Sequence, residues 1–229
     1  MLFGLGDIVA SWKAIANALP FWRDNDPIDD IADLEQFVAT RAAFVAQKTL
    51  YGYLKARIGT RYPRVFDDET FVRSINIAKY HVFAGCLSDL AIYAVATALE
   101  NEEISDESRS ALAKRCFQEG LNGNSSDVPI EFKFDDTVQT FAGRLEITKW
   151  ASDALHWNNF SESPRALIRW APIADHLKDD DAEIVRNSIK FAWRDVREQF
   201  RKRLVREHLL ADCRRQLKPS TGVEADVLF

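Results

Sequence analysis

VFAGCLSDLAIYAVATAL, residues 82–99, is an eighteen-residue run with a single charged residue, Asp89. A run this apolar must be hidden on nearly all sides, either in a bilayer or among other helices. Each of its strongly apolar residues favours membrane insertion by only about 0.3 to 0.6 kcal/mol. Their sum barely offsets the cost of roughly 3 kcal/mol for a central Asp. The run therefore predicts the buried central helix of a bundle, with a membrane-spanning helix as the alternative.

The composition of the 229-residue chain is that of a globular helical protein. Hydrophobic residues make up 47% and charged residues 28%, whereas glycine (9 residues) and proline (7 residues) are scarce. These values disfavour disorder, and they disfavour a many-stranded β fold because its turns need both glycine and proline. The length allows one large domain or two small ones. We therefore expect an all-α protein, a single bundle of about six or seven helices.

Cysteine usage and the first residues bear on the cellular compartment. Cys86, Cys116 and Cys213 are odd in number and widely spaced, without a CxxC motif. This pattern predicts neither a disulfide framework nor a thiolate metal site. The beginning of the chain lacks the positive n-region and uninterrupted apolar stretch of a signal peptide. We expect a cytoplasmic protein without a bound metal or cofactor.

Capping residues and stop signals mark where the helices begin and end. A side-chain oxygen at a helix start can accept a hydrogen bond from a free backbone N–H group, and the sequence offers such caps at Asp29 or Asp30, at Asp67 or Asp68, and at Ser105. Glycine and proline mark the helix ends. The expected helical segments cover residues 2–19, 29–58, 69–99, 105–120 and 137–157, a short segment after Ser163 and Pro164, and a long basic segment at 181–217.

One long loop, around residues 120–136, separates the fourth expected helix from the fifth. Its sequence GLNGNSSDVPIEFKF (120–134) is the only cluster of Gly, Asn and Ser, and it predicts a flexible loop with a short β turn or ribbon at 130–134. No repeat or shift in composition separates two domains. We expect residues 1–217 to form one domain, with a boundary near 120–130 as the alternative, and 218–229 to be a mobile tail.

Common catalytic motifs are absent from the sequence, including GxSxG, SxxK, GxxxxGK[ST], GxGxxG and HExxH. Asp153 and His156 lie one turn apart on an expected helix, where they can form an acid–base or metal-binding pair. A di-iron bundle, however, needs two Glu-x-x-His pairs and two further glutamates. The pair is therefore interpreted as a polar surface pair, and no metal site is predicted.

Asp89 and His81 are the other weak catalytic candidates. An ionised carboxylate on an apolar helix needs a partner, and Arg41, Lys48, Arg57 or a histidine could reach Asp89 across a bundle. Such a pair is more often structural than catalytic. For His81, the simpler interpretation is a histidine partly buried against the second helix.

The charge of the chain is concentrated near its C-terminal end. Residues 183–218 contain eleven Lys and Arg against five Asp and Glu, within a chain of net charge −5. Such a basic helix face is either a solvated surface or a docking surface for an acidic protein, a phosphate or a lipid headgroup. Nucleic acid is not expected as a partner, because the pI is near 5.5 and no DNA-binding motif is present. Helical spacing aligns five of the cations on one stripe, namely Arg186, Lys190, Arg194, Arg197 and Arg201.

Two stretches, VATRAAFVAQKTLYGYLKARIGTRYP (38–63) and INIAKYHVFAGCLSDLAIYAV (75–95), carry a resemblance to a known family. They resemble an uncharacterised family of helical proteins, mostly from alphaproteobacteria, some of whose members carry an esterase label. The resemblance covers about the middle third of the chain and implies a bacterial cytoplasmic protein. It brings no catalytic residues, and the GxSxG motif of serine esterases is missing here.

The sequence supports three hypotheses for function. The first is a non-enzymatic interaction or adaptor protein whose basic C-terminal helix docks an acidic protein or other anionic partner. The second is a hydrolase with an unrecognised site near Asp89 and His81. The third is a peripheral membrane protein attached through residues 2–19, while integral insertion is not expected. The oligomeric state is left open.

Overall fold

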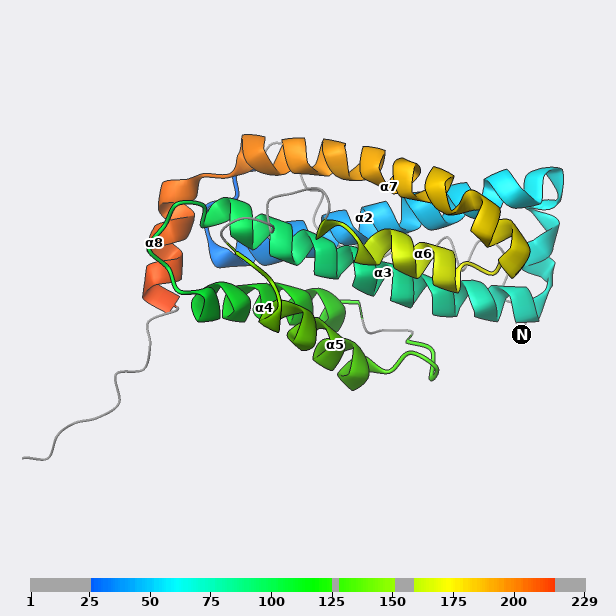
Figure 1. Ribbon diagram of the computed structural model, residues 1–229, viewed down its shortest axis with the longest axis horizontal. Coiled ribbons are helices and arrows are strands. Elements are labelled where there is room, and N and C mark those ends of the chain that lie inside the picture. The colour runs from blue at the N-terminus through cyan, green and yellow to red at the C-terminus, as the bar shows by residue number, and fades with distance from the viewer. Residues whose placement is uncertain (1–25, 125–127, 151–158, 217–229) are drawn as a thin grey trace, which may run out of the picture.

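The computed structural model describes residues 26–124, 128–150 and 159–216. These residues form seven α-helices and no strand beyond one isolated bridge (Figure 1). The expected all-α bundle is thus confirmed. The helix expected at 2–19, the last part (151–157) of the helix expected at 137–157, and the tail expected at 218–229 lie outside the described residues. The helices are α2 (Ile31–Ile58), α3 (Glu69–Ala98), α4 (Asp106–Asn122), α5 (Phe134–Glu146), α6 (Glu162–Trp170), α7 (Asp175–Arg203) and α8 (Arg206–Gln216), with short 3-10 helices at Gly59–Arg61 and Arg64–Asp67.

Helix α3 is the central element of the bundle. Asp68 caps its N-terminus by accepting hydrogen bonds from the backbone N–H groups of Thr70 (2.8 Å) and Phe71 (3.3 Å). Helices α2, α4 and α6 pack around it (Figure 1). Among the described helices, α3 alone is long and apolar enough to cross a membrane, and 94% of its apolar window is buried inside the protein. Residues 82–99 accordingly lie in the hydrophobic core.

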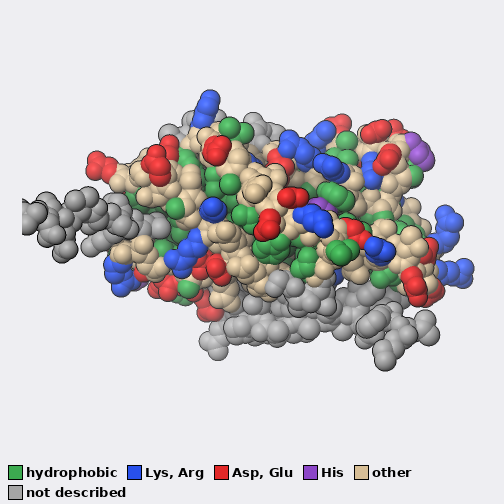
Figure 2. Space-filling view, turned by 90° about the horizontal axis from the view of Figure 1, so that it is seen from below, with side chains coloured by type: hydrophobic (Ala, Val, Ile, Leu, Met, Phe, Trp, Pro, Cys, Tyr) green, Lys and Arg blue, Asp and Glu red, His purple; other side chains and the backbone are tan. Residues whose placement is uncertain are grey.

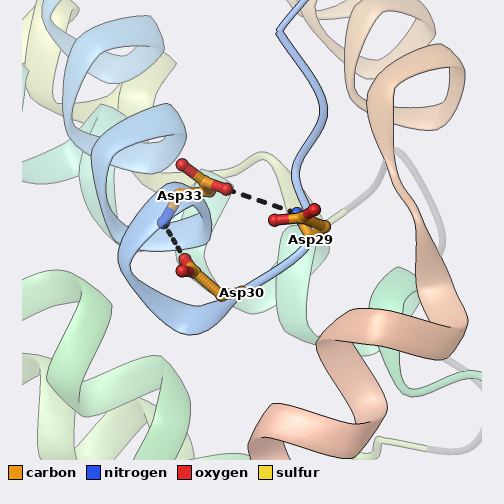
Figure 3. A group of neighbouring side chains, drawn as sticks. All are labelled: Asp29, Asp30 and Asp33. Carbon is orange, nitrogen blue, oxygen red and sulfur yellow. Dashed lines mark hydrogen bonds between the residues drawn. The ribbon is translucent and has the colours of Figure 1, made fainter.

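Three carboxylates gather at the start of α2 (Figure 3). Asp30 caps the helix by accepting a hydrogen bond from the Asp33 N–H group (2.8 Å), and Asp33 in turn accepts one from the Asp29 N–H group (3.4 Å). Burial and the two neighbouring carboxylates raise the pKa of Asp33, although the bond from Asp29 opposes them. Asp212 of α8 accepts another bond, from the Ile31 N–H group (3.0 Å). These contacts account for the cluster as a helix cap.

The single helix predicted over 181–217 is wrong, because the chain breaks between α7 and α8. Leu204 has extended backbone angles and forms an isolated bridge with Ile28. The Ile28 N–H group donates to the Arg203 carbonyl (2.8 Å), and the Val205 N–H group donates to the Ile28 carbonyl (3.0 Å). At this point the backbone around Leu204 bonds to Ile28, which precedes α2, and the helical hydrogen bonds that would join α7 to α8 are not formed. At its other end α7 begins six residues earlier than predicted, at Asp175.

The structure also tests two expectations around α5. The predicted helix over 137–157 is shorter at its C-terminal end, since α5 ends at Glu146. Of the two alternatives predicted at 130–134, a short β turn or a ribbon, the turn is confirmed, because the Phe132 N–H group donates to the Pro129 carbonyl (2.9 Å). Phe132 is buried against the rings of Tyr80 and His81, so the turn is anchored to α3 by aromatic packing.

Candidate anion-binding groove

Asp89 fixes the position of α6. It is only 1% exposed, and its carboxylate accepts hydrogen bonds from the Glu162 N–H group (3.2 Å), the Ser163 N–H group (2.8 Å) and the Ser163 hydroxyl (2.6 Å). Arg144 completes the set with a salt bridge of 2.8 Å. Burial raises the pKa of Asp89, whereas Arg144 and Ser163 favour the charged carboxylate and lower it. Asp89 therefore caps the N-terminus of a helix that lies far away in the sequence.

The partner of Asp89 is not one of the cations considered from the sequence. Arg144 comes from α5, whereas Arg57 pairs with Asp181 of α7. Arg144 also donates to the Ser88 hydroxyl (2.6 Å) and to a backbone carbonyl, that of Asn159. The network thereby joins α3, α5 and the segment that leads into α6.

Trp193 links the same network to α7. Its indole N–H donates to the Ser163 hydroxyl (3.0 Å), and the ring is almost completely buried. Since Ser163 donates onward to Asp89, the hydrogen bonds run from α7 through α6 to α3. Helix α6, which has only nine residues, is therefore held firmly beside α7.

A groove of about 680 Å³ lies between α6 and α7. Its apolar lining includes Phe160, Pro164, Ile168, Ile189 and Trp193. One acidic side chain, that of Asp179, is found among its described lining residues. Against this single acid stand five cationic side chains, namely Arg165, Arg169, Arg186, Lys190 and Arg197. The groove thus combines an apolar lining with a marked excess of positive charge.

Arg197 is held in the groove by aromatic rings. Its guanidinium carbon lies 5.2 Å from the ring centroid of Tyr93 and 5.9 Å from that of Phe160. Its Nε atom is buried and has no hydrogen-bond partner among the described residues. An unsatisfied buried donor costs about 1 to 3 kcal/mol, so Arg197 carries an unpaired polar atom beside the groove that it lines.

The structure divides the basic stripe predicted from the sequence. Arg186, Lys190 and Arg197 line the groove, but Arg194 and Arg201 do not. Arg194 lies over the Phe191 ring at 5.8 Å and 3.7 Å from the Asp195 carboxylate, and Arg201 donates to the Tyr93 hydroxyl (3.2 Å).

Arg165 and Arg169 on α6 are the cations that sequence reasoning missed. Their spacing of four residues, which places both on one side of a helix, was the available signal. Arg165 also pairs with Glu162, and Arg169 lies over the Trp170 ring at 5.3 Å. Both cations act in the groove only because α6 is placed beside α7.

His81 lies in a different environment from the groove. Its ring stacks on that of Trp170, with centroids 3.5 Å apart and planes within 2°. Burial and the nearby Arg169 lower the pKa of His81 to about 4, so the imidazole is neutral at pH 7. His81 and Ser88 line a second cavity of about 600 Å³, whereas Asp89 does not. Of the four weak catalytic candidates, Asp153 and His156 lie outside the described residues, and the structure does not bring the other two into one site.

The second cavity has mixed charge. Its acids Glu131, Asp136 and Glu162 are balanced by Lys133, Arg144, Arg165 and Arg169. Cationic, acidic and hydrophobic side chains are likewise interspersed over the face seen from below in Figure 2. By contrast, the groove between α6 and α7 is dominated by one sign of charge.

Comparison of the chain with protein-family models, with curated proteins and with solved structures finds no match.

Proposed function

We propose that this protein is a non-enzymatic helical interaction protein that docks an acidic protein in the groove between α6 and α7. One observation carries the proposal: two adjacent helices contribute five cations to a groove in which Asp179 is the one acid among the described lining residues. Such a local excess of one charge attracts the opposite charge and orients it on approach.

The type of cation favours carboxylate recognition. Four of the five cations are arginines, whose planar guanidinium groups bind carboxylates through two parallel hydrogen bonds. The apolar lining adds a surface on which hydrophobic side chains of a partner are removed from water. The groove is thus suited to a partner that carries carboxylates next to apolar side chains.

The length of the cationic row favours a polypeptide partner. Arg186 and Arg197 are eleven residues apart on one helix, which corresponds to about 16 Å along its axis. Helices also offer no free backbone edge for strand addition, so a partner is recognised through side chains. Nucleic acid is disfavoured because the whole chain carries a net charge of −5.

The experiment is a binding assay with charge-reversal variants. A defined probe, a poly-glutamate peptide of twenty residues, is titrated into the protein in low salt, and proteins that co-purify with the chain are identified in parallel. The double variant Arg186→Glu with Arg197→Glu is expected to lose both kinds of binding. Binding by the wild type is expected to weaken in high salt, because the Debye length is already only about 8 Å at physiological ionic strength.

A matched control separates the groove from general charge. Lys202→Glu with Arg214→Glu makes the same change in net charge at exposed positions outside the groove lining. This control is expected to bind as the wild type does. Equal loss in both double variants, or unchanged binding in the groove variant with its fold intact, would reject the groove as the docking site.

A further inference from the structure

The groove between α6 and α7 has an apolar floor. On α7 the side chains of Ile189 and Trp193 line it and are each 1% exposed, and on α6 those of Pro164 and Ile168 line it. The two residues of each pair are four positions apart, so each pair lies on one side of its helix. Since α6 packs directly beside α7 (Figure 1), the two pairs face the same groove.

Cations form a rim on each side of this floor. On α6, Arg165 and Arg169 each directly follow a floor residue, and on α7 Arg186 lies three residues before Ile189 and Lys190 directly after it. All four cations are exposed, so they lie on the solvent side of the floor residues. Arg165 and Arg169 also line the second cavity, which places them on the ridge of α6 between that cavity and the groove. Positive charge therefore lies on both sides of an apolar centre.

Both rims keep cations that no carboxylate of the described residues neutralises. Arg165 pairs with Glu162. Arg169 on the rim of α6, and Arg186 and Arg197 on the rim of α7, form no salt bridge within the part of the chain that the structure describes. Each rim thus has positive charge available to a partner.

We propose that the acidic partner enters this groove as an amphipathic α-helix whose apolar stripe is flanked on both sides by carboxylates; this inference rests on the proposed function and specifies its partner. In a helix, side chains three and four residues apart form one stripe, and those beside the stripe point sideways. The stripe then lies on the floor, while the carboxylates reach Arg169 on one rim and Arg186 and Arg197 on the other. The last two are about 16 Å apart along α7, which corresponds to about three turns of the partner helix.

An extended peptide does not match this arrangement. Successive side chains of a strand point to opposite faces. When one face of the strand lies on the floor, the other face points to solvent, so neither row of side chains points toward a rim. A helix is the regular structure that presents apolar side chains downward and carboxylates to both sides at once.

The test is titration of the full chain with two labelled sixteen-residue peptides of identical composition, made of leucine, glutamate and alanine. In the first peptide the leucines form one helical stripe with glutamates on both flanks, and in the second leucine and glutamate alternate as in a strand. The first is expected to bind at least tenfold more tightly and to gain helical circular dichroism on binding. Replacement of one solvent-facing alanine of the first peptide by proline interrupts the helix without removing a contacting side chain, and is expected to weaken binding at least tenfold.

Single charge reversals test the two rims. Arg169→Glu on α6 and Arg186→Glu on α7 are each expected to weaken binding of the first peptide at least fivefold, because each sets a like charge beside one flank of glutamates. Lys202→Glu makes the same change in charge at an exposed position of α7 outside the groove lining, and is expected to bind as the wild type does. Thermal melting shows whether each variant is folded.

The outcomes distinguish this inference from the proposed function. Equal binding of the two peptides, with loss of binding in both rim variants, would overturn the helical partner and leave the docking of acidic proteins intact. Loss of binding in one folded rim variant but not in the other would contradict recognition from both sides. If neither peptide binds the wild type in low salt, the proposed function and this inference are both wrong.

Discussion

Asp89 on α3 binds the N-terminus of α6 through Ser163, 74 residues later in the chain, at 2.8 Å from its backbone nitrogen and 2.6 Å from its hydroxyl. The only charge in the apolar run is thus the group that positions one wall of the cationic groove. The same carboxylate neutralises Arg144, which would otherwise be a half-buried cation close to the core. Asp89 is therefore structural, and its effect on the groove is indirect.

Replacement of Asp89 by Ala is expected to lower the free energy of unfolding by about 3 to 5 kcal/mol, because Arg144 and the start of α6 lose their buried partner. Urea unfolding measures this change. Asp175→Ala is the control, since this side chain is 95% exposed and its loss is expected to cost less than about 0.5 kcal/mol. A loss below about 1 kcal/mol at Asp89 would show that the capping network contributes little.

Gly85 allows α3 and α6 to approach each other closely. A Cβ atom at this position would lie 2.9 Å from the Glu162 carbonyl oxygen and 3.0 Å from the Ala166 Cβ atom. Gly85→Ala is therefore expected to destabilise the protein by about 1 to 3 kcal/mol, since backbone atoms must move apart.

Gly52→Ala serves as the matched control for Gly85→Ala. Gly52 also lies inside a helix, but a Cβ atom there meets nothing within 4 Å. Alanine favours the helix over glycine by about 0.5 to 1 kcal/mol, so this variant is expected to be more stable than the wild type. Thermal melting of both variants gives the comparison, and an equal response at the two sites would contradict the close approach at Gly85.

His81 is expected to make stability depend on pH between about 6.5 and 4. The folded protein holds its pKa at about 4, below the ordinary value of 6.5, so in this range the unfolded chain binds more protons. The contribution of His81 to stability is therefore complete above about pH 6.5 and is lost as the pH falls toward 4. His81→Phe, which preserves an aromatic ring against Trp170, is expected to lose stability less steeply over this range.

The difference between wild type and His81→Phe isolates this effect. Carboxyl groups with perturbed pKa values, such as Glu35 and Asp89, contribute equally to both proteins. Melting temperatures of both proteins at pH 7, 6 and 5 give the two slopes. A titration of His81 by NMR with a pKa near 6.5 would overturn the assignment.

The three cysteines are expected to be unreactive in the folded protein. Cys86, Cys116 and Cys213 are all buried, and burial raises the pKa of each thiol, that of Cys213 to about 11. Because the thiolate is the reactive form, a thiol reagent such as Ellman's reagent is expected to label none of them at pH 7.5 and all three in urea. Rapid labelling of one thiol without denaturant would contradict its burial.

The sequence by itself determined most of the helical architecture. Asp30, Asp68 and Ser105 cap helices where the sequence predicted caps, because a cap depends on side chains within three residues of the N–H groups they bind. The apolar run of 82–99 similarly predicted its own burial, since no surface position accommodates so many apolar side chains. Caps depend on neighbouring residues and burial of the run depends on its composition, so both can be predicted from the amino-acid sequence alone.

Only the tertiary structure decided which distant residues meet. Three features depend on how the helices are placed. Asp89 pairs with Arg144, the last predicted helix breaks opposite Ile28, and only part of the basic stripe lines the groove. Several cations of similar reach were available to Asp89 in the sequence, and helical periodicity contains no information about which neighbour faces each stripe. Packing of the whole core selects among such pairings, because burial of the shared apolar surface outweighs any one polar contact.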